Sequence, residues 1–232
     1  MEQYKFNIYM RIIINNVREL DDLYKCIKLE KNNISLYILE ANFLRENHKK
    51  LKKFLTEKQR SKSKKYFFLE DRYNYIVTHA VVNIIFYKIY GKVVRDENIK
   101  FNNGKPYIDN YPKFNYNISH TKGCSVVAFC EKKVGIDIEG YNKIIDYNDI
   151  LKKYFFYETE SFKDIDLKIF YTLWTIKESY LKFTEIGIRG LDSVDVIKIK
   201  NNHAVVKNIY NNETIYVKII YLNNKFVISL CI

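Results

Sequence analysis

Residues 114–139, FNYNISHTKGCSVVAFCEKKVGIDIE, are the stretch from which the fold class of this chain is inferred. Within it, SVVAFC (125–130) and VGIDI (134–138) are short, apolar and rich in β-branched residues, and a polar EKK lies between them. Such segments favour strands, and a short polar connection favours the pairing of neighbouring strands. We therefore predict an antiparallel hairpin over residues 125–138.

Helical and strand patterns continue on both sides of this hairpin. Upstream, ISLYILEANF (34–43) predicts a strand, and DRYNYIVTHAVVNIIFYKIYG (71–91) predicts a long buried helix that Gly91 can end. Downstream, residues 147–186 have helical spacing. The tail alternates as three or four strands would, at residues 192–200, 203–206, 214–222 and 225–232. These patterns predict the α+β class.

The segment from residue 98 to residue 117 divides the chain, because it holds Gly104 and both prolines, Pro106 and Pro112. We expect one α+β subdomain over residues 34–117 and a second over residues 118–232. The two are similar in size but show no repeat in the residues themselves. Residues 1–33 are an N-terminal extension of unknown role, which we interpret as a flexible or loosely docked arm.

Composition narrows the class of protein and of partner. With 232 residues, of which 47% are hydrophobic, the chain can bury a sizeable core. The 39 Lys and Arg residues outnumber the 27 Asp and Glu residues, and a net charge of +12 favours anionic partners such as nucleic acid, anionic lipid, phosphorylated cofactors or acidic proteins. The four cysteines lack zinc-ligand spacing, and residues 4–14 are too short and polar to span a bilayer. We expect a cytoplasmic protein with no membrane segment.

Two carboxylates in the GIDIE segment are candidate metal ligands. On a strand, Asp137 and Glu139 would project from one face, while Ile136 and Ile138 would point into the core. Adjacent carboxylates repel each other unless a cation lies between them, and hard oxygen ligands favour magnesium or manganese. An exposed strand face with two solvated acids explains the same pattern equally well.

A second candidate group lies in FYTLWTIKESYLK, residues 170–182, where helical spacing aligns Trp174, Glu178 and Lys182. In a functional interpretation Glu178 joins Asp137 and Glu139 at a metal, and Lys182 and Lys177 lie near phosphates bound to that metal. In a structural interpretation Glu178 and Lys182 form a surface ion pair and Trp174 belongs to the core.

Three further features could bind phosphate. Ser119 and His120 follow an extended segment and can donate hydrogen bonds to phosphate oxygens, and Gly104 lets Lys105 approach a ligand closely. A Ser-His dipeptide is not a catalytic triad, since neighbouring side chains on an extended chain point apart. The basic run KQRSKSKK (58–65) could hold a terminal phosphate or an acidic surface, or could simply be solvated. The sequence contains neither GxxxxGK[ST] nor GxGxxG, so a nucleotide-binding loop is not indicated.

The order and spacing of these segments resemble the 4'-phosphopantetheinyl transferase superfamily, in its larger two-subdomain type that activates peptide and polyketide synthetases. FNYNISHTKGCSVVAFCEKKVGIDIE is similar to the central block of that family, FYTLWTIKESYLKFTEIGI to its second block, and GKPYI to its upstream element. The resemblance covers roughly residue 34 to the C-terminus. It implies two pseudo-symmetric α+β subdomains in one monomer, with the active site in a cleft between them.

The resemblance also implies roles for individual residues. Coenzyme A would be the co-substrate, with Lys182 on its pyrophosphate and Lys62 near its 3'-phosphate. The remaining implied ligands are Asp137, Glu139 and Glu178 for Mg²⁺ or Mn²⁺, Lys105 and Pro106 for the adenine end, and Ser119 and His120 for the phosphates. One departure is Asn74, which stands where the family often has an arginine at the 3'-phosphate, so that Arg72 or Lys62 would have to compensate. Residues 1–33 have no counterpart in the family.

The implied reaction is transfer of the 4'-phosphopantetheine arm to a serine of an acidic apo acyl or peptidyl carrier protein, with release of adenosine 3',5'-bisphosphate. Lys182 would stabilise charge on the leaving phosphate, and Glu178 is the candidate base for the serine proton, a role that stays open. Neither the carrier nor the acceptance of acylated coenzyme A follows from the sequence.

Two rival functions use other features of the chain. The charge and the 21 tyrosines would suit a nucleic-acid-binding protein. The acidic pair followed by Lys143 would suit a metal-dependent nuclease. Neither rival explains the order of the GKP, ISH and KES segments.

Overall fold

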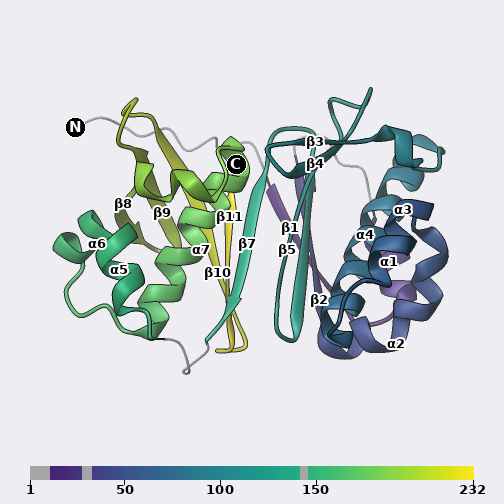
Figure 1. Cartoon of the computed structure of the whole chain (residues 1–232), viewed down its shortest axis with the longest axis horizontal. Helices are drawn as coiled ribbons and strands as arrows, with labels where there is room; N and C mark the ends of the chain where they lie inside the picture. Colours follow the sequence, from purple (N-terminus) through teal and green to yellow (C-terminus); the bar gives the residue numbers. More distant parts are fainter. Residues whose placement is uncertain (1–10, 28–32, 142–145) are drawn as a thin grey trace. The chain divides into compact units, whose positions relative to one another are not determined.

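The computed structural model describes residues 11–27, 33–141 and 146–232, which belong to two compact units. Of the described residues, the first unit comprises those up to residue 102 and residues 106–132, and the second comprises residues 103–105 and those from residue 133 onward. Each unit combines a β-sheet with helices, so the predicted α+β class is confirmed (Figure 1). Within the described ranges, no helix is both long and apolar enough to cross a membrane.

The first unit contains a four-stranded sheet in the order β1-β2-β6-β5. β1 (Arg11–Val17) runs parallel to β2 (Asn33–Glu40), while β2 and β5 (Asn115–Thr121) both pair antiparallel with β6 (Cys124–Cys130). The other elements of this region are α1 (Leu20–Cys26), α2 (Ala41–Leu51), η1 (Lys52–Phe54), α3 (Glu57–Ser63), α4 (Leu69–Tyr90) and η2 (Asp96–Asn98), with a ribbon formed by β3 (Ile99–Asn102) and β4 (Lys105–Ile108).

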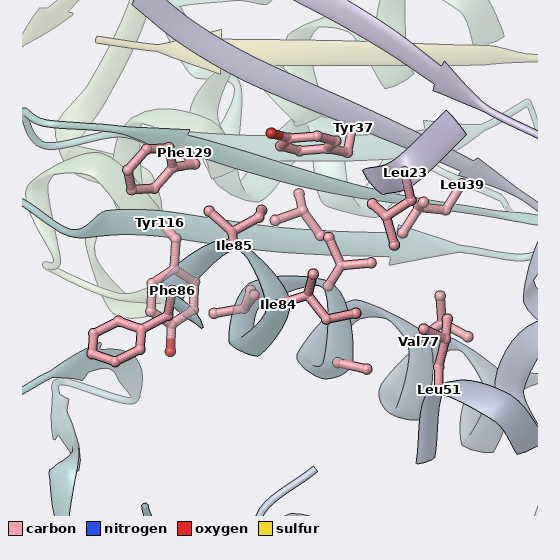
Figure 2. Packing of buried hydrophobic residues seen from close by; sticks show 14 of the residues in the cluster. Leu23, Tyr37, Leu39, Leu51, Val77, Ile84, Ile85, Phe86, Tyr116 and Phe129 are labelled. Atoms are coloured by element: carbon pink, nitrogen blue, oxygen red, sulfur yellow. The ribbon is translucent and has the colours of Figure 1, made fainter. Parts of the chain in front are cut away.

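Helix α4 supplies much of the core of the first unit. Its apolar residues are buried around most of its circumference, as the predicted helix over residues 71–91 requires. Gly91 ends the helix in the left-handed conformation, with φ of 64°, and its N–H donates to the Tyr87 carbonyl at 2.8 Å. Figure 2 shows Ile84, Ile85 and Phe86 of α4 packed toward side chains of the sheet. Burial of these side chains from water holds the helix to the strands.

The second unit contains a five-stranded sheet in the order β7-β11-β10-β9-β8, with antiparallel neighbours throughout. Its strands are β7 (Gly135–Gly140), β8 (Val194–Lys200), β9 (His203–Asn208), β10 (Thr214–Leu222) and β11 (Phe226–Cys231). Its helices are α5 (Asn148–Tyr154), α6 (Phe156–Ser161), α7 (Leu167–Thr184) and the 3-10 helix η3 (Ile188–Ser193). The strands predicted for the tail are therefore confirmed, as is the helical region over residues 147–186.

Helix α7 lies unusually close to β7. A Cβ atom placed on Gly135 would lie 2.0 Å from the Ser179 carbonyl oxygen and 2.5 Å from the Phe183 nitrogen, so only glycine fits there. The Asp166 carboxylate caps the start of the helix by accepting a hydrogen bond of 2.7 Å from the Ile169 N–H. The close approach brings the side chains of β7 next to those of α7.

The predicted hairpin over residues 125–138 is wrong. β6 pairs with β2 and β5 in one sheet, whereas β7 pairs with β11 in the other. Local β-propensity predicts both strands but does not specify the strand with which each one pairs. β7 packs on α7 and therefore belongs to the second unit.

The division of the chain also differs from the expected boundary between residues 117 and 118. β5 and β6 belong to the first unit because they complete its sheet, so that unit extends to residue 132. In the expected N-terminal arm, Arg11–Val17 forms β1 and Leu20–Cys26 forms α1. Pairing of β1 with β2 accounts for this difference, since it adds a strand to the sheet. The remainder of the predicted arm, residues 1–10 and 28–32, lies outside the described residues.

Candidate active site

Strand β7 carries the two candidate carboxylates of the GIDIE segment. Ile136 and Ile138 are fully buried, as the predicted alternation requires. Asp137 is also buried, and Glu139, two residues farther along, shares its strand face and is half-buried. Gly135 lies on the same face, which is the one that packs against α7. Asp137 is therefore enclosed beside a helix and does not lie on an open surface.

Helix α7 places Lys182 and Glu178 near Asp137. The Lys182 Nζ atom lies 2.6 Å from the Asp137 Oδ1 atom, and the two side chains are 28% and 6% exposed. Burial raises the pKa of Glu178, and the neighbouring Asp137 carboxylate raises it further, while Lys182 lowers it. β7 and α7 therefore bring Asp137, Glu178 and Lys182 close to one another, as expected from the sequence.

The donor atoms of this site suit a hard divalent cation. In the described ranges, no group of three or more His, Cys, Asp or Glu residues is gathered closely enough to hold a metal. The negative charge of Asp137 nevertheless raises the pKa of Glu178, so the two carboxylates are close enough to repel each other. Glu139 lies on the same strand face as Asp137. Carboxylate oxygens are the ligands that magnesium prefers, so the residue types fit the ion.

Lys105 also lies beside this region of the second unit. Its ammonium donates to the carbonyls of Val134 and Lys182, each at 2.9 Å, and lies 3.6 Å from the Glu185 Oε1 atom. The Asn103 side chain donates to the Glu185 carbonyl at 2.8 Å. The turn between β3 and β4 is therefore fastened to the C-terminal end of α7.

Lys177 does not lie near the other cations of the site, which overturns its predicted position near phosphates. It is 1% exposed, forms an ion pair of 2.9 Å with the fully buried Glu158, and donates to the Tyr154 carbonyl at 2.7 Å. One residue along a helix changes the direction of the side chain by about 100°. Lys177 consequently faces α6 while Glu178 faces β7, and the sequence offered no signal for Glu158 as its partner.

Trp174 takes the structural role. It packs against the core of the second unit, with its ring 6.3 Å from that of Phe155 and 6.2 Å from that of Phe170. This placement agrees with the interpretation of Trp174 as a core residue.

The remaining predicted ligands lie in the first unit. Ser119 is buried and His120 exposed on β5, and their side chains point to opposite faces of the sheet. Pro106 is half-buried on β4. Lys62, exposed on α3, has its Nζ atom 5.4 Å from the centroid of the Tyr75 ring.

His79 is buried within range of the charges of Lys62 and His120. Its ring stacks on Tyr75 with 4.0 Å between centroids, and its Nδ1 atom lies 3.1 Å from the Tyr75 carbonyl oxygen. Burial lowers the pKa of His79 to about 4, with the charges of Lys62 and His120 acting in the same direction. The sequence prediction did not include His79, although its i, i+4 spacing from Tyr75 indicated a shared helix face.

Asn74, the departure from the family pattern, points into the first unit. It is 4% exposed, and its Oδ1 atom accepts a hydrogen bond of 2.9 Å from the Ser125 hydroxyl on β6. Arg72 donates to the Tyr66 carbonyl at 3.1 Å and so holds the segment between α3 and α4. Asn74 thus has a structural partner, and Lys62 is the more accessible cation of this region.

Comparison with known proteins gives an independent result. Residues 133–231 match the family described as the 4'-phosphopantetheinyl transferase superfamily. The chain is 27% identical over 185 residues to 4'-phosphopantetheinyl transferase psf-1 of Bacillus pumilus, covering 75% of this chain and 77% of the relative. It is 25% identical over 201 residues to 4'-phosphopantetheinyl transferase Sfp of Bacillus subtilis (strain 168), covering 80% and 85%. Identity to 4'-phosphopantetheinyl transferase gsp of Aneurinibacillus migulanus is 32% over 151 residues, covering 61% and 57%.

The matched region coincides with one part of the candidate site. Residues 133–231 extend from two residues before β7 to the end of β11 and include Asp137, Glu139, Glu178 and Lys182. The first-unit candidates, among them Lys62 and His120, lie outside that match. The carboxylates on β7 and α7 are therefore the part of the site that the family match covers.

Proposed function

We propose that this chain, a member of the 4'-phosphopantetheinyl transferase superfamily, transfers the 4'-phosphopantetheine arm of coenzyme A to a serine of an apo acyl or peptidyl carrier protein. Adenosine 3',5'-bisphosphate is the other product. The relatives named as transferases support this activity, and the observation that carries the proposal is the grouping of Asp137, Glu178 and Lys182 between β7 and α7.

Asp137, Glu139 and Glu178 are the proposed ligands of a magnesium ion, for which manganese can substitute. The ion, when bound, supplies positive charge that stabilises the pyrophosphate and the departing phosphate. Burial is the main cause of the raised pKa of Glu178, and the charge of Asp137 adds to it; a cation between the two carboxylates would relieve both effects. Glu139 would complete the set from the same face of β7.

Lys182 has a distinct role, to bind the pyrophosphate. Its ammonium is the more exposed partner of the pair with Asp137, so it can turn to a phosphate oxygen when Asp137 binds a cation. A fixed positive charge beside the leaving group lowers the barrier of phosphoryl-type transfer. Glu178 is also the carboxylate proposed to accept the proton of the carrier serine, because it lies on α7 beside Asp137 and Lys182.

Other residues are proposed to bind coenzyme A. Lys105 and Pro106 would contact its adenine end, Ser119 and His120 its phosphates, and Lys62 its 3'-phosphate. The accessibility of Lys62 and His120 supports an anion-binding role. The pseudo-symmetry of the two units, the cleft, the monomeric state and the cytoplasmic location expected from the resemblance stay predictions.

An intact-mass assay tests this function. The chain is incubated with coenzyme A, magnesium and several apo carrier proteins, and each carrier is weighed before and after. We expect the mass of a carrier to increase by one phosphopantetheine group, and to stay unchanged when its acceptor serine is replaced by alanine. No mass increase on any carrier would refute the proposal.

The family match does not favour the two rival functions. Salt-dependent binding to single-stranded oligonucleotides without any transfer would support a nucleic-acid-binding protein. Magnesium-dependent cleavage of nucleic acid would support a nuclease. Lys143, on which the nuclease interpretation depends, lies outside the described residues.

A further inference from the structure

Three consecutive apolar residues, Phe67, Phe68 and Leu69, form an exposed patch where α3 leads into α4. They are 90%, 66% and 56% exposed. The two phenyl rings contact each other edge to face, with 5.1 Å between their centroids. Single exposed apolar residues are ordinary, but a contiguous group of them commonly marks an interaction surface.

The backbone that carries the patch is fixed. Tyr66, next to the patch, turns inward and packs on Tyr75 with 5.2 Å between ring centroids. The Arg72 side chain donates to the Tyr66 carbonyl at 3.1 Å, and the Lys65 N–H donates to the Lys62 carbonyl at 3.0 Å. Phe67 and Phe68 therefore face solvent from an anchored turn, which lowers the entropic cost of binding a partner through them.

Positive charge is concentrated in the segment that precedes this patch in the sequence. Residues 45–65 contain ten Lys and Arg residues and two Glu residues, so this short segment accounts for +8 of the net charge of +12. Lys64 and Lys65, which only Tyr66 separates from the patch in the sequence, are exposed. An aromatic centre with a basic rim complements an acidic protein surface that carries apolar side chains.

We propose that Phe67, Phe68 and Leu69 form the docking surface for the acidic apo carrier protein, an inference that rests on the proposed function. The patch supplies apolar anchors, and the lysines of residues 58–65 attract the partner over a longer range.

The test compares two variants of the full chain in the transfer assay. Phe67→Ser combined with Phe68→Ser removes both rings, and Phe101→Ser removes a different exposed aromatic residue, 65% exposed on β3. We expect the double variant to raise the KM for the apo carrier about tenfold or more, while kcat and the KM for coenzyme A change less than about twofold. The Phe101→Ser control should leave all three constants near those of the wild type.

A charge variant provides a second measurement. Lys64→Glu combined with Lys65→Glu should raise the KM for the carrier at low salt, and the difference from the wild type should shrink as salt increases. Far-ultraviolet circular dichroism and thermal unfolding establish that every variant is folded.

Each other outcome overturns the proposal in a recognisable way. If the wild type transfers normally and both KM values of the aromatic variant are unchanged, the docking surface is refuted and the proposed function stands. If the KM for coenzyme A rises as much as that for the carrier, the patch binds coenzyme A. Loss of co-sedimentation with phosphatidylglycerol vesicles, with an unchanged KM for the carrier, would assign the patch to a membrane. If the wild type transfers to no carrier, the proposed function and the docking surface fail together.

Discussion

Two carboxylate–ammonium pairs flank α7, and they differ mainly in their access to water. Lys177 and Glu158 are 2.9 Å apart and 1% and 0% exposed, whereas Lys182 and Asp137 are 2.6 Å apart and 28% and 6% exposed. Both lysines belong to the same short segment, TIKESYLK. The comparison shows how one helix can carry a structural pair on one side and a pair available to ligands on the other.

The partners of the buried pair make it structural. Lys177 also donates to the Tyr154 carbonyl and lies 4.4 Å from the Phe155 ring centroid, while Glu158 accepts a hydrogen bond of 2.9 Å from the Val196 N–H. Burial raises the pKa of Glu158 and lowers that of Lys177, and each partner opposes the shift of the other. The pair joins α6, α7 and β8, so removing or displacing either side chain would disturb the packing of these three elements.

The largest expected difference between the two pairs is in stability, and Lys177→Met and Lys182→Met measure it. Removal of one partner from a buried pair leaves an uncompensated charge, so Lys177→Met should lower the free energy of unfolding by about 3–5 kcal/mol. Lys182→Met should lower it by less than about 1 kcal/mol, because its pair is partly open to solvent. Urea unfolding followed by circular dichroism measures both changes. Equal losses in the two variants would contradict the distinction.

The same two lysines should exchange their order of importance in catalysis. Lys182→Met should reduce kcat for phosphopantetheine transfer by about 100-fold, equivalent to about 2.7 kcal/mol, because the leaving phosphate loses a neighbouring cation. Steady-state transfer assays measure the effect. The exposed Lys198 on β8 provides the matched control, and Lys198→Met should retain the wild-type rate. A Lys182→Met variant with a wild-type kcat would remove Lys182 from the proposed mechanism.

Replacing glutamate by glutamine should have opposite effects on the two sides of α7. The folded-state pKa of Glu178 is raised, so its contribution to stability is complete below the unfolded-state pKa and is lost as pH rises through the folded-state value. Glu178→Gln should therefore stabilise the metal-free protein above that value by less than about 1 kcal/mol, with no gain at acid pH.

Glu158→Gln provides the contrast. Burial raises the pKa of Glu158 as well, but its replacement leaves the Lys177 ammonium buried without an opposite charge, so this variant should be less stable at neutral pH. Thermal unfolding at several pH values, with a chelator present, measures both variants. If the two substitutions shift stability in the same direction at neutral pH, the electrostatic distinction between the pairs does not hold.

Local sequence patterns predicted the elements that carry the candidate site. The period-two alternation in GIDIE accounts for the burial of Ile136 and Ile138, and the helical period accounts for Glu178 and Lys182 on one side of α7. These signals arise within a few residues, so no knowledge of distant contacts is needed.

Contacts between distant segments could not be predicted in this way. β-propensity does not specify a partner, so the sequence predicts that β7 pairs with β6, whereas β7 pairs with β11. The parallel pairing of β1 with β2 has no local turn signal. The predicted position of Lys177 is wrong for the same reason, since its partner Glu158 lies on another helix.

The most direct test of the account is the transfer activity of Asp137→Ala across a magnesium titration, measured by the intact mass of an apo carrier protein. Asp137 is the residue that connects β7 to both Lys182 and Glu178. We predict that the wild type modifies the carrier in a magnesium-dependent way, while Asp137→Ala stays folded but gives no transfer above background. Wild-type activity of Asp137→Ala at saturating magnesium would contradict the account.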